Sequence, residues 1–283
     1  MSGVGPVTRF APSPTGRLHL GHALSAVRAH DLARRGGGRF LLRIEDIDGT
    51  RSRPEHVETI FRDLEWLGLE WDDLSFQSER LDHYAAAQGR LADLLYPCFC
   101  TRAEIAASLS APHGATPLYP GTCRHLSHQE RGARMGDPHG WRIDMARAVE
   151  RVGALYWHDE RAGAIVADPL SHGDVILARK DAPASYHLAV TVDDAAQGVT
   201  DVVRGVDLFE ATHVHRLLQA LLGLPTPRYH HHPLIVGADG QRLAKRHGAP
   251  ALAAMREGGE DGRALADALR RNMLPAGFRL GEA

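Results

Sequence analysis

The chain has 283 residues, of which 43% are hydrophobic and 24% charged, and its formal net charge is −2. These values describe a soluble globular protein that is larger than one typical domain. The near-neutral net charge excludes binding of nucleic acid through a global positive charge. No apolar run approaches the ~18 residues of a membrane span, and the N-terminus lacks the regions of a secretory signal. We therefore expect a cytoplasmic protein without membrane contact, and we expect it to act as a monomer.

Strands and helices alternate in the first hundred residues. Two apolar, β-rich runs are typical of buried parallel strands, residues 7–11 and 39–45. Helices are expected at 20–35, 54–67 and 81–96, since glycines follow the first two and a proline opens the second. This alternation predicts an α/β fold with a layered sheet.

The periodic pattern is lost from residue 97 to about 140, where Pro, Gly, His and Cys dominate. Strand-like pieces between 141 and 180 indicate a small separate module inserted into the sheet domain. Regular patterns return at 186–194, 199–205, 210–222 and 230–236, and the last of these precedes a hairpin turn at 237–240. The predicted divisions are 1–97 and 184–248 for the two halves of the sheet domain, 98–183 for the insert and 249–283 for a short helical tail.

The stretch RFAPSPTGRLHLGH, residues 9–22, joins the first strand to the first helix. Ligands of open α/β sheets bind at the carboxyl ends of strands, and a helix N-terminus attracts phosphate. Gly21 has no Cβ and lets a flat base approach the backbone. His19 and His22 share a helix face and can donate hydrogen bonds to phosphate oxygens. Taken alone, however, the H-x-G-H pattern favours local capping or packing of the two histidines.

This stretch resembles the signature of class I aminoacyl-tRNA synthetases, specifically the glutamyl branch, whose H-x-G-H element binds ATP. Three further blocks resemble the same branch in the same order, RIEDID (43–48), YHLAVTVDDAAQGVTDVVRGVDL (186–208) and RLAKRHGAPAL (242–252). The resemblance implies a Rossmann-like catalytic domain that binds ATP with Mg²⁺. It assigns catalysis to His19, His22 and Lys245, and ATP binding to these three together with Gly21 and Arg242.

The lysine loop departs from the K-M-S-K or K-L-S-K pattern of the class. Arg242 replaces the first lysine and Ala244 replaces the serine, whereas Lys245 matches the second lysine, which meets the ATP phosphates. A lysine is a compact, mobile point charge that suits a loop closing over a triphosphate. The alternative is a solvated basic turn. The lost serine hydroxyl removes one phosphate contact, which leaves the rate of activation open.

Glutamate presents two carboxylates and one ammonium, so a pocket for it needs two cationic forks and one anion. The resemblance supplies Arg9 and Arg204 for the carboxylates and Glu45 for the ammonium, with polar contacts from Ser13 and Tyr186. Arginine suits bidentate recognition of carboxylates, and the alternative for Arg9 considered alone is a surface ion pair. We expect glutamate rather than glutamine, because a neutral amide needs no full positive charge.

Three cysteines and a tyrosine form the pattern C-x-C…Y-x-x-x-C. An odd number of cysteines argues against a disulfide framework, and three thiolates with one more donor suit a tetrahedral structural zinc site. Unliganded thiols are the plainer alternative, and three histidines compete as fourth ligand, His113, His125 and His128. The pattern resembles the zinc site of the glutamyl-queuosine tRNA(Asp) synthetases. That resemblance implies one zinc ion held by Cys98, Cys100, Tyr119 and Cys123.

Only 35 residues follow position 248, fewer than the ~50 of a small domain, whereas full glutamyl-tRNA synthetases carry a large anticodon-binding region there. The glutamyl-queuosine family resembles the chain in this respect. It implies activation of L-glutamate without tRNA and transfer to the queuosine base in the anticodon of tRNA(Asp). The alternatives are a truncated enzyme charging the 3′ end of tRNA(Glu) and a non-catalytic paralogue that binds glutamate or tRNA. Candidate RNA contacts are Arg28, Arg34, Arg35, Arg39, Arg263, Arg270 and Arg271.

Overall fold

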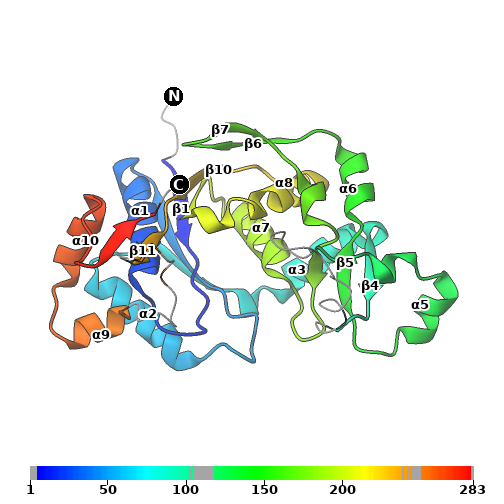
Figure 1. Cartoon of the computed structure of the whole chain (residues 1–283), viewed down its shortest axis with the longest axis horizontal. Coiled ribbons are helices and arrows are strands. Elements are labelled where there is room, and N and C mark those ends of the chain that lie inside the picture. Colours follow the sequence, from blue (N-terminus) through cyan, green and yellow to red (C-terminus); the bar gives the residue numbers. More distant parts are fainter. Residues whose placement is uncertain are drawn as a thin grey trace.

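The structure is a computed structural model that describes residues 5–101, 104, 118–237, 239–240, 243 and 250–281. Its centre is a parallel sheet, which confirms the predicted α/β class (Figure 1). The first three strands lie in the order β1-β2-β3, with β1 at Val7–Phe10, β2 at Arg39–Ile44 and β3 at Asp73–Phe76. β1 and β2 are buried along nearly their whole length, as expected of inner parallel strands, whereas β3 at the edge is partly exposed.

A four-stranded group lies in the order β7-β6-β10-β9. Its strands are β6 (Tyr156–Asp159), β7 (Gly163–Val166), β9 (Asp201–Gly205) and β10 (Arg228–His232). The Thr200 N–H donates to the Val7 carbonyl over 2.9 Å, so β9 lies beside β1. Strand order therefore reverses between β1 and β9, and such a switch point is where open α/β sheets bind ligands.

Four helices cover one end of the molecule, α1 (Leu20–Arg35), α2 (Pro54–Trp66), α9 (Leu252–Glu257) and α10 (Gly262–Arg270). Figure 1 shows α9 and α10 beside α2 and α1, and the four share one hydrophobic cluster with the sheet. The lack of a side chain at Gly262 lets α10 approach the carbonyl and indole of Trp66. The ends of α1 and α2 lie where the glycines and Pro54 predict them.

A second hydrophobic cluster lies under α3 (Leu81–Arg90), α6 (Met145–Val152), α7 (Tyr186–Ala196) and α8 (Ala211–Leu221). Beyond it lies an antiparallel sheet in the order β4-β5-β8, with α5 (His128–Arg134) at the far end (Figure 1). Its strands are β4 (Leu95–Cys98), β5 (Gly140–Ile143) and β8 (Ile176–Ala178). Within the described residues, no helix combines the length and hydropathy needed to cross a bilayer.

Two predicted elements are divided in the structure. The helix expected at 81–96 ends at Arg90, and β4 begins at Leu95, because Tyr96 and Cys98 pair with β5 some 40 residues later. The strand expected at 230–236 is interrupted by Pro233, which has no N–H for a ladder, and it continues as β11 (Ile235–Gly237). The turn predicted after β11 is present, but in the described chain β11 pairs with β12 (Phe278–Leu280).

The predicted insert is joined to the main sheet. The β6–β7 hairpin lies between residues 98 and 183, yet β6 runs parallel to β10, with Asp159 opposite Tyr229. The segment therefore contributes to two sheets, and only β4, β5 and β8 form a sheet of their own. The boundaries at 98 and 183 stay a prediction.

Candidate active site

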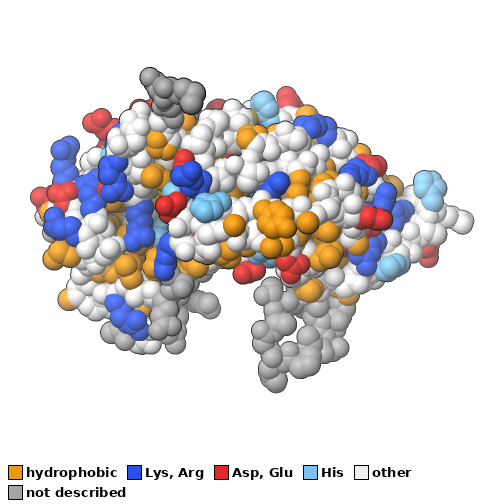
Figure 2. Space-filling model, turned by 90° about the horizontal axis from the view of Figure 1, so that it is seen from above, with side chains coloured by type: hydrophobic (Ala, Val, Ile, Leu, Met, Phe, Trp, Pro, Cys, Tyr) orange, Lys and Arg blue, Asp and Glu red, His pale blue; other side chains and the backbone are white. Residues whose placement is uncertain are grey.

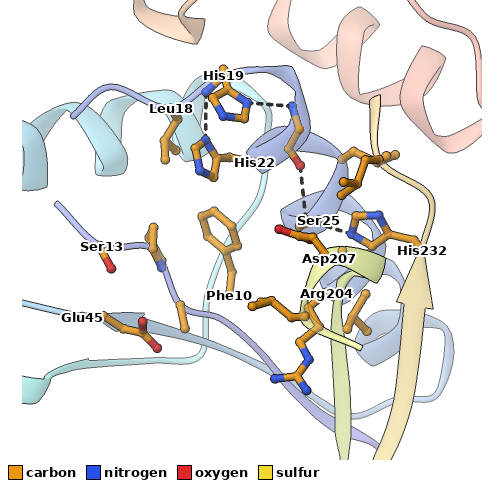
Figure 3. Close-up of a pocket in the computed structure, with 18 of the residues that line it drawn as sticks. Phe10, Ser13, Leu18, His19, His22, Ser25, Glu45, Arg204, Asp207 and His232 are labelled. Atoms are coloured by element: carbon orange, nitrogen blue, oxygen red, sulfur yellow. Dashed lines mark hydrogen bonds between the residues drawn. The ribbon is translucent and has the colours of Figure 1, made fainter. Parts of the chain in front are cut away.

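A cavity of about 520 Å³ opens at the switch point between β1 and β9. It is lined by the loop after β1, the start of α1, and residues at the ends of β2, β9 and β10. In the view of Figure 3, Glu45 and Arg204 lie toward one end of the cavity, His19 and His22 lie toward the other, and Phe10 lies between them. The cavity therefore brings together residues that are up to 234 positions apart in the sequence (9 to 243).

Both histidines of the H-x-G-H corner cap α1 through their Nδ1 atoms. The Gly21 N–H donates to His19 Nδ1, and the His19 N–H donates to His22 Nδ1, each over 3.1 Å. In neutral rings this arrangement places the proton on Nε2. Local capping and phosphate binding are thus compatible, because capping uses only the Nδ1 atom of each ring.

Glu45 follows β2 and faces the cavity. Burial raises the pKa of its carboxyl to about 7, against the opposing effect of Arg43 and Arg9. The structure gives no hydrogen bond to this carboxylate from the described residues. An ammonium group in the cavity would supply the missing partner and favour the charged carboxylate.

Arg9 lines the same cavity but is already engaged. Its Nε lies 2.9 Å from Asp194 Oδ1, and its Nη2 lies 3.4 Å from Asp194 Oδ2. Arg43 donates to the same carboxylate over 2.5 Å. Burial opposes ionisation of Asp194, but the two guanidinium groups outweigh it and hold the pKa of Asp194 below its usual value. Asp194 therefore fixes both arginines beneath the cavity.

Arg204 lies at the end of β9 and is 5% exposed. Its Nε donates to His231 Nε2 over 3.1 Å and its Nη2 to Thr212 Oγ1 over 2.7 Å. Its Nη1 lies 3.3 Å from both the Tyr186 hydroxyl and His215 Nδ1. The predicted contact residues Arg204 and Tyr186 are thus direct neighbours in the cavity wall.

The remaining predicted residues of this site divide into two groups. Ser13 and Gly21 line the cavity, and a Cβ at Gly21 would lie 3.0 Å from the His19 ring. Arg242 and Lys245 lie outside the described residues. Leu243, between them, lines the cavity and donates its N–H to the Ile235 carbonyl over 3.2 Å.

The cysteine cluster lies at the end of β4. The three Sγ atoms are within 4.8 Å of one another, and those of Cys100 and Cys123 are 3.5 Å apart. The Tyr119 hydroxyl lies 3.5 Å from Cys98 Sγ and 3.6 Å from Cys100 Sγ. Ligand atoms around a tetrahedral zinc with ~2.3 Å bonds are about 3.8 Å apart, so these four groups fit such an ion. Neither His125 nor His128 belongs to the group.

Several side chains of the site were missed by sequence reasoning. They are Asp194, Thr212, His215, His231 and, in the cavity wall, Ser25 and His232, whose side chains meet at 2.8 Å. Two signals were available. Asp193 and Asp194 interrupt an otherwise apolar helix, and buried carboxylates need cationic partners. The run of three histidines at 230–232 lies in a strand that ends at the cavity.

Several of the candidate RNA contacts have partners within the chain. Arg34 lies 2.7 Å from Asp72, Arg270 lies 3.0 Å from Asp31, and Arg28 donates to Asn272 over 2.8 Å. Figure 2 shows basic side chains, with acidic ones among them, gathered at the end of the molecule formed by α1 and α10. This pairing makes the surface a mixed one, so RNA binding by these arginines stays a prediction.

Comparison with known proteins agrees with this geometry. The chain matches the family of class I tRNA synthetases (E and Q), catalytic domain, over residues 6–278. A glutamyl-Q tRNA(Asp) synthetase from Rhodobacter capsulatus is 48% identical over 268 residues, which cover 89% of this chain and 95% of the relative. A glutamate–tRNA ligase from Aquifex aeolicus is 39% identical over 89% of this chain and 54% of its own length.

The crystal structure of glutamate-tRNA synthetase from Elizabethkingia anophelis superposes with a TM-score of 0.75 at 30% identity, over 87% of this chain. The chain spans about half the length of that synthetase, 55%. The family match spans the corner that caps α1 and every residue that lines the cavity. The chain therefore belongs to the class I tRNA synthetases of the glutamate and glutamine branch, within the glutamyl-Q tRNA(Asp) synthetase family, and it is an ATP-dependent ligase.

Proposed function

We propose that the chain activates L-glutamate with ATP in the absence of tRNA and transfers it to the queuosine base in the anticodon of tRNA(Asp). The observation that carries the proposal is the shared cavity, in which the Arg204 guanidinium and the Glu45 carboxylate lie toward one end and His19 and His22 toward the other. A cation and an anion in one wall match the carboxylate and ammonium of an amino acid. The names of the relatives support tRNA(Asp) as acceptor.

The reaction has two steps. A carboxylate oxygen of glutamate attacks the α-phosphorus of ATP and expels pyrophosphate, which gives glutamyl-adenylate. A hydroxyl of the queuosine cyclopentenediol then attacks the acyl carbon, AMP leaves, and the hydroxyl proton passes to solvent. His19 and His22 donate from Nε2 to the phosphate oxygens, Lys245 adds a positive charge, and Mg²⁺ accompanies ATP as part of the substrate.

The four-ligand cluster at β4 is proposed to hold zinc in a structural role. Cys98, Cys100, Cys123 and Tyr119 would fill a tetrahedral shell without an open position for substrate, so the cluster takes no part in the reaction. We further propose that the chain works in the cytoplasm, where ATP and tRNA are found, and as a monomer.

The test is ATP–pyrophosphate exchange with each amino acid in the absence of tRNA, followed by transfer of labelled glutamate to tRNA(Asp) with and without queuosine. Exchange with glutamate alone, and transfer only to queuosine-bearing tRNA(Asp), is the expected result. Periodate oxidation of the tRNA before transfer tests whether a diol accepts the glutamate. Because periodate cleaves the queuosine diol and the 3′ ribose diol alike, unmodified tRNA(Asp) is the control that separates the two acceptors. Absence of exchange with every amino acid would contradict the proposal.

A second function is charging of the 3′ end of tRNA(Glu). The 39% identity to a glutamate–tRNA ligase favours it as the alternative. It predicts glutamate exchange that depends on tRNA(Glu), with label at the 3′ end. The same two measurements therefore distinguish the two functions.

A further inference from the structure

Neutral groups alone hold the guanidinium of Arg204. Its hydrogen-bond partners are two imidazoles, a threonine hydroxyl and a phenol. In the part of the chain that the structure describes, no ion pair joins Arg204 to a carboxylate, whereas Arg9 and Arg43 share Asp194. Within one pocket, Arg9 is thus fixed by an anion, whereas Arg204 is fixed by neutral groups alone.

Asp159 determines which ring nitrogen of His231 accepts a hydrogen bond. His231 Nδ1 lies 2.8 Å from Asp159 Oδ2, so the ring proton resides on Nδ1 and the Nε2 lone pair accepts from Arg204. The Asp159 carboxylate also accepts backbone N–H groups from His231 at 3.1 Å and from Arg161 and Ala162 at 3.0 Å. Its negative charge is therefore engaged on the far side of the imidazole.

His215 is oriented by a third imidazole. Its Nδ1 accepts from Arg204, so its Nε2 carries the proton and donates to His187 Nδ1 over 3.2 Å. Burial and the nearby positive charge of Arg204 lower the pKa of His215 well below its usual value. Burial likewise lowers the pKa of His187 and of His231 to about 4, so these rings stay neutral at pH 7.

We propose that His215 and His231 are positioning residues that fix Arg204 for a substrate carboxylate while leaving its positive charge uncompensated. The inference rests on the proposed function, because it takes a glutamate carboxylate as the partner of Arg204. An Asp or Glu at either position would hold the guanidinium equally well but would neutralise it. The pocket would then lose its preference for an anionic side chain over the neutral amide of glutamine.

Substitutions at position 215 separate charge from shape. His215→Asn keeps a neutral acceptor near the place of Nδ1, and His215→Asp has nearly the same shape with a negative charge. We expect His215→Asp to raise the KM for glutamate in ATP–pyrophosphate exchange on the order of a hundredfold, with the KM for ATP nearly unchanged. Selectivity for glutamate over glutamine should fall in parallel. His215→Asn should recover most of the affinity and selectivity that His215→Asp loses.

Equal losses in the two variants would overturn the inference, because shape and not charge would then matter. An unchanged glutamate KM in His215→Asp would overturn it as well. His231→Gln and His231→Glu give the same comparison at the second acceptor if a variant at position 215 fails to unfold cooperatively on heating. A wild-type protein without glutamate-dependent exchange would instead contradict the proposed function, and the inference with it.

Discussion

Glu45 and Arg204 face one cavity from different strands, and their surroundings set their charges differently. Arg204 is surrounded by neutral hydrogen-bond acceptors, whereas burial raises the pKa of Glu45 to about 7. The protein without ligand therefore carries a part-protonated carboxyl where the proposed function places an ammonium. Binding of that ammonium favours the ionised carboxyl and lowers its pKa, so substrate binding releases a proton below pH 7.

We therefore predict that glutamate binds more weakly as the pH falls below 7. Its KM in ATP–pyrophosphate exchange should rise about tenfold per pH unit below the pKa of Glu45 and level off above it. The pKa values of His187, His231 and His232 are lowered to about 4, so these rings do not titrate in this range. KM measured between pH 5.5 and 8.5 checks the prediction.

Glu45→Gln is the control for this titration. The variant should have a glutamate KM raised at least about tenfold at pH 8, because a charge-assisted hydrogen bond is lost, and its KM should no longer depend on pH near 7. A pH profile that Glu45→Gln leaves unchanged would assign the titration to another group.

At the scale of single residues, the sequence predicted the groups that belong to a contiguous motif. His19, His22 and Glu45 stand within two short blocks, and each lines the cavity. Asp194 and His231 contribute through partners far away in the chain, 185 positions from Arg9 in one case and 27 from Arg204 in the other. Hydrophobic periodicity reports which face is buried, and it does not report which buried charges meet.

At the scale of elements, β4 and the 3₁₀ turn at Thr122–His125 are held together by few apolar contacts. The small cluster under them consists of Tyr96, Phe99 and the cysteines, with Tyr119 and Leu126 packed against it. The guanidinium of Arg142 covers the Tyr119 ring at 3.8 Å, and its Nε lies 3.2 Å from Cys98 Sγ. A segment with so small a core is the kind that a structural metal stabilises.

We predict one zinc ion per chain and its loss in Cys98→Ser. Removal of one thiolate should also lower the unfolding temperature, and a chelator should lower that of the wild type but not that of the variant. Metal analysis of the purified protein and thermal unfolding check both points. Tyr119→Phe keeps the ring beneath Arg142 and removes only the hydroxyl oxygen, so it tests Tyr119 as the fourth ligand. His125→Ala removes a competing histidine and is the matched control. Wild-type protein without metal, or metal lost from His125→Ala alone, would contradict this ligand set.

The elements that the sequence predicted poorly are those completed by distant partners. The predicted helix ends six residues beyond the observed end of α3 at Arg90. The chain leaves the helix because the residues that follow form β4, which pairs with β5. Helix ends with local signals were correct, since Pro54 and the glycines after Arg35 act through their own backbone. Helix ends set by local backbone chemistry can be predicted from one stretch of sequence, whereas strand pairing across about 40 residues cannot.

At the scale of the whole molecule, three distant segments meet at the switch point. The corner that caps α1 supplies the histidines, β9 and α7 supply Arg204 and Tyr186, and the third segment carries the lysine loop. Two described contacts place the flanks of that loop at the cavity. The Leu243 N–H donates a hydrogen bond to the Ile235 carbonyl, and Ala251 forms an isolated antiparallel β-bridge with His19. Lys245 lies between these two anchors in the sequence.

We therefore predict that Lys245→Ala abolishes adenylate formation and leaves glutamate binding nearly intact. Pyrophosphate exchange should fall at least about a hundredfold, because a charge that stabilises the developing phosphate charge is lost. The glutamate-induced rise in unfolding temperature should persist, since the proposed glutamate contacts all lie outside the lysine loop. Lys180→Ala removes the only other lysine of the chain and should leave exchange unchanged. Near-normal exchange in Lys245→Ala would remove this lysine from the mechanism and leave the phosphate charge to the histidines and Mg²⁺.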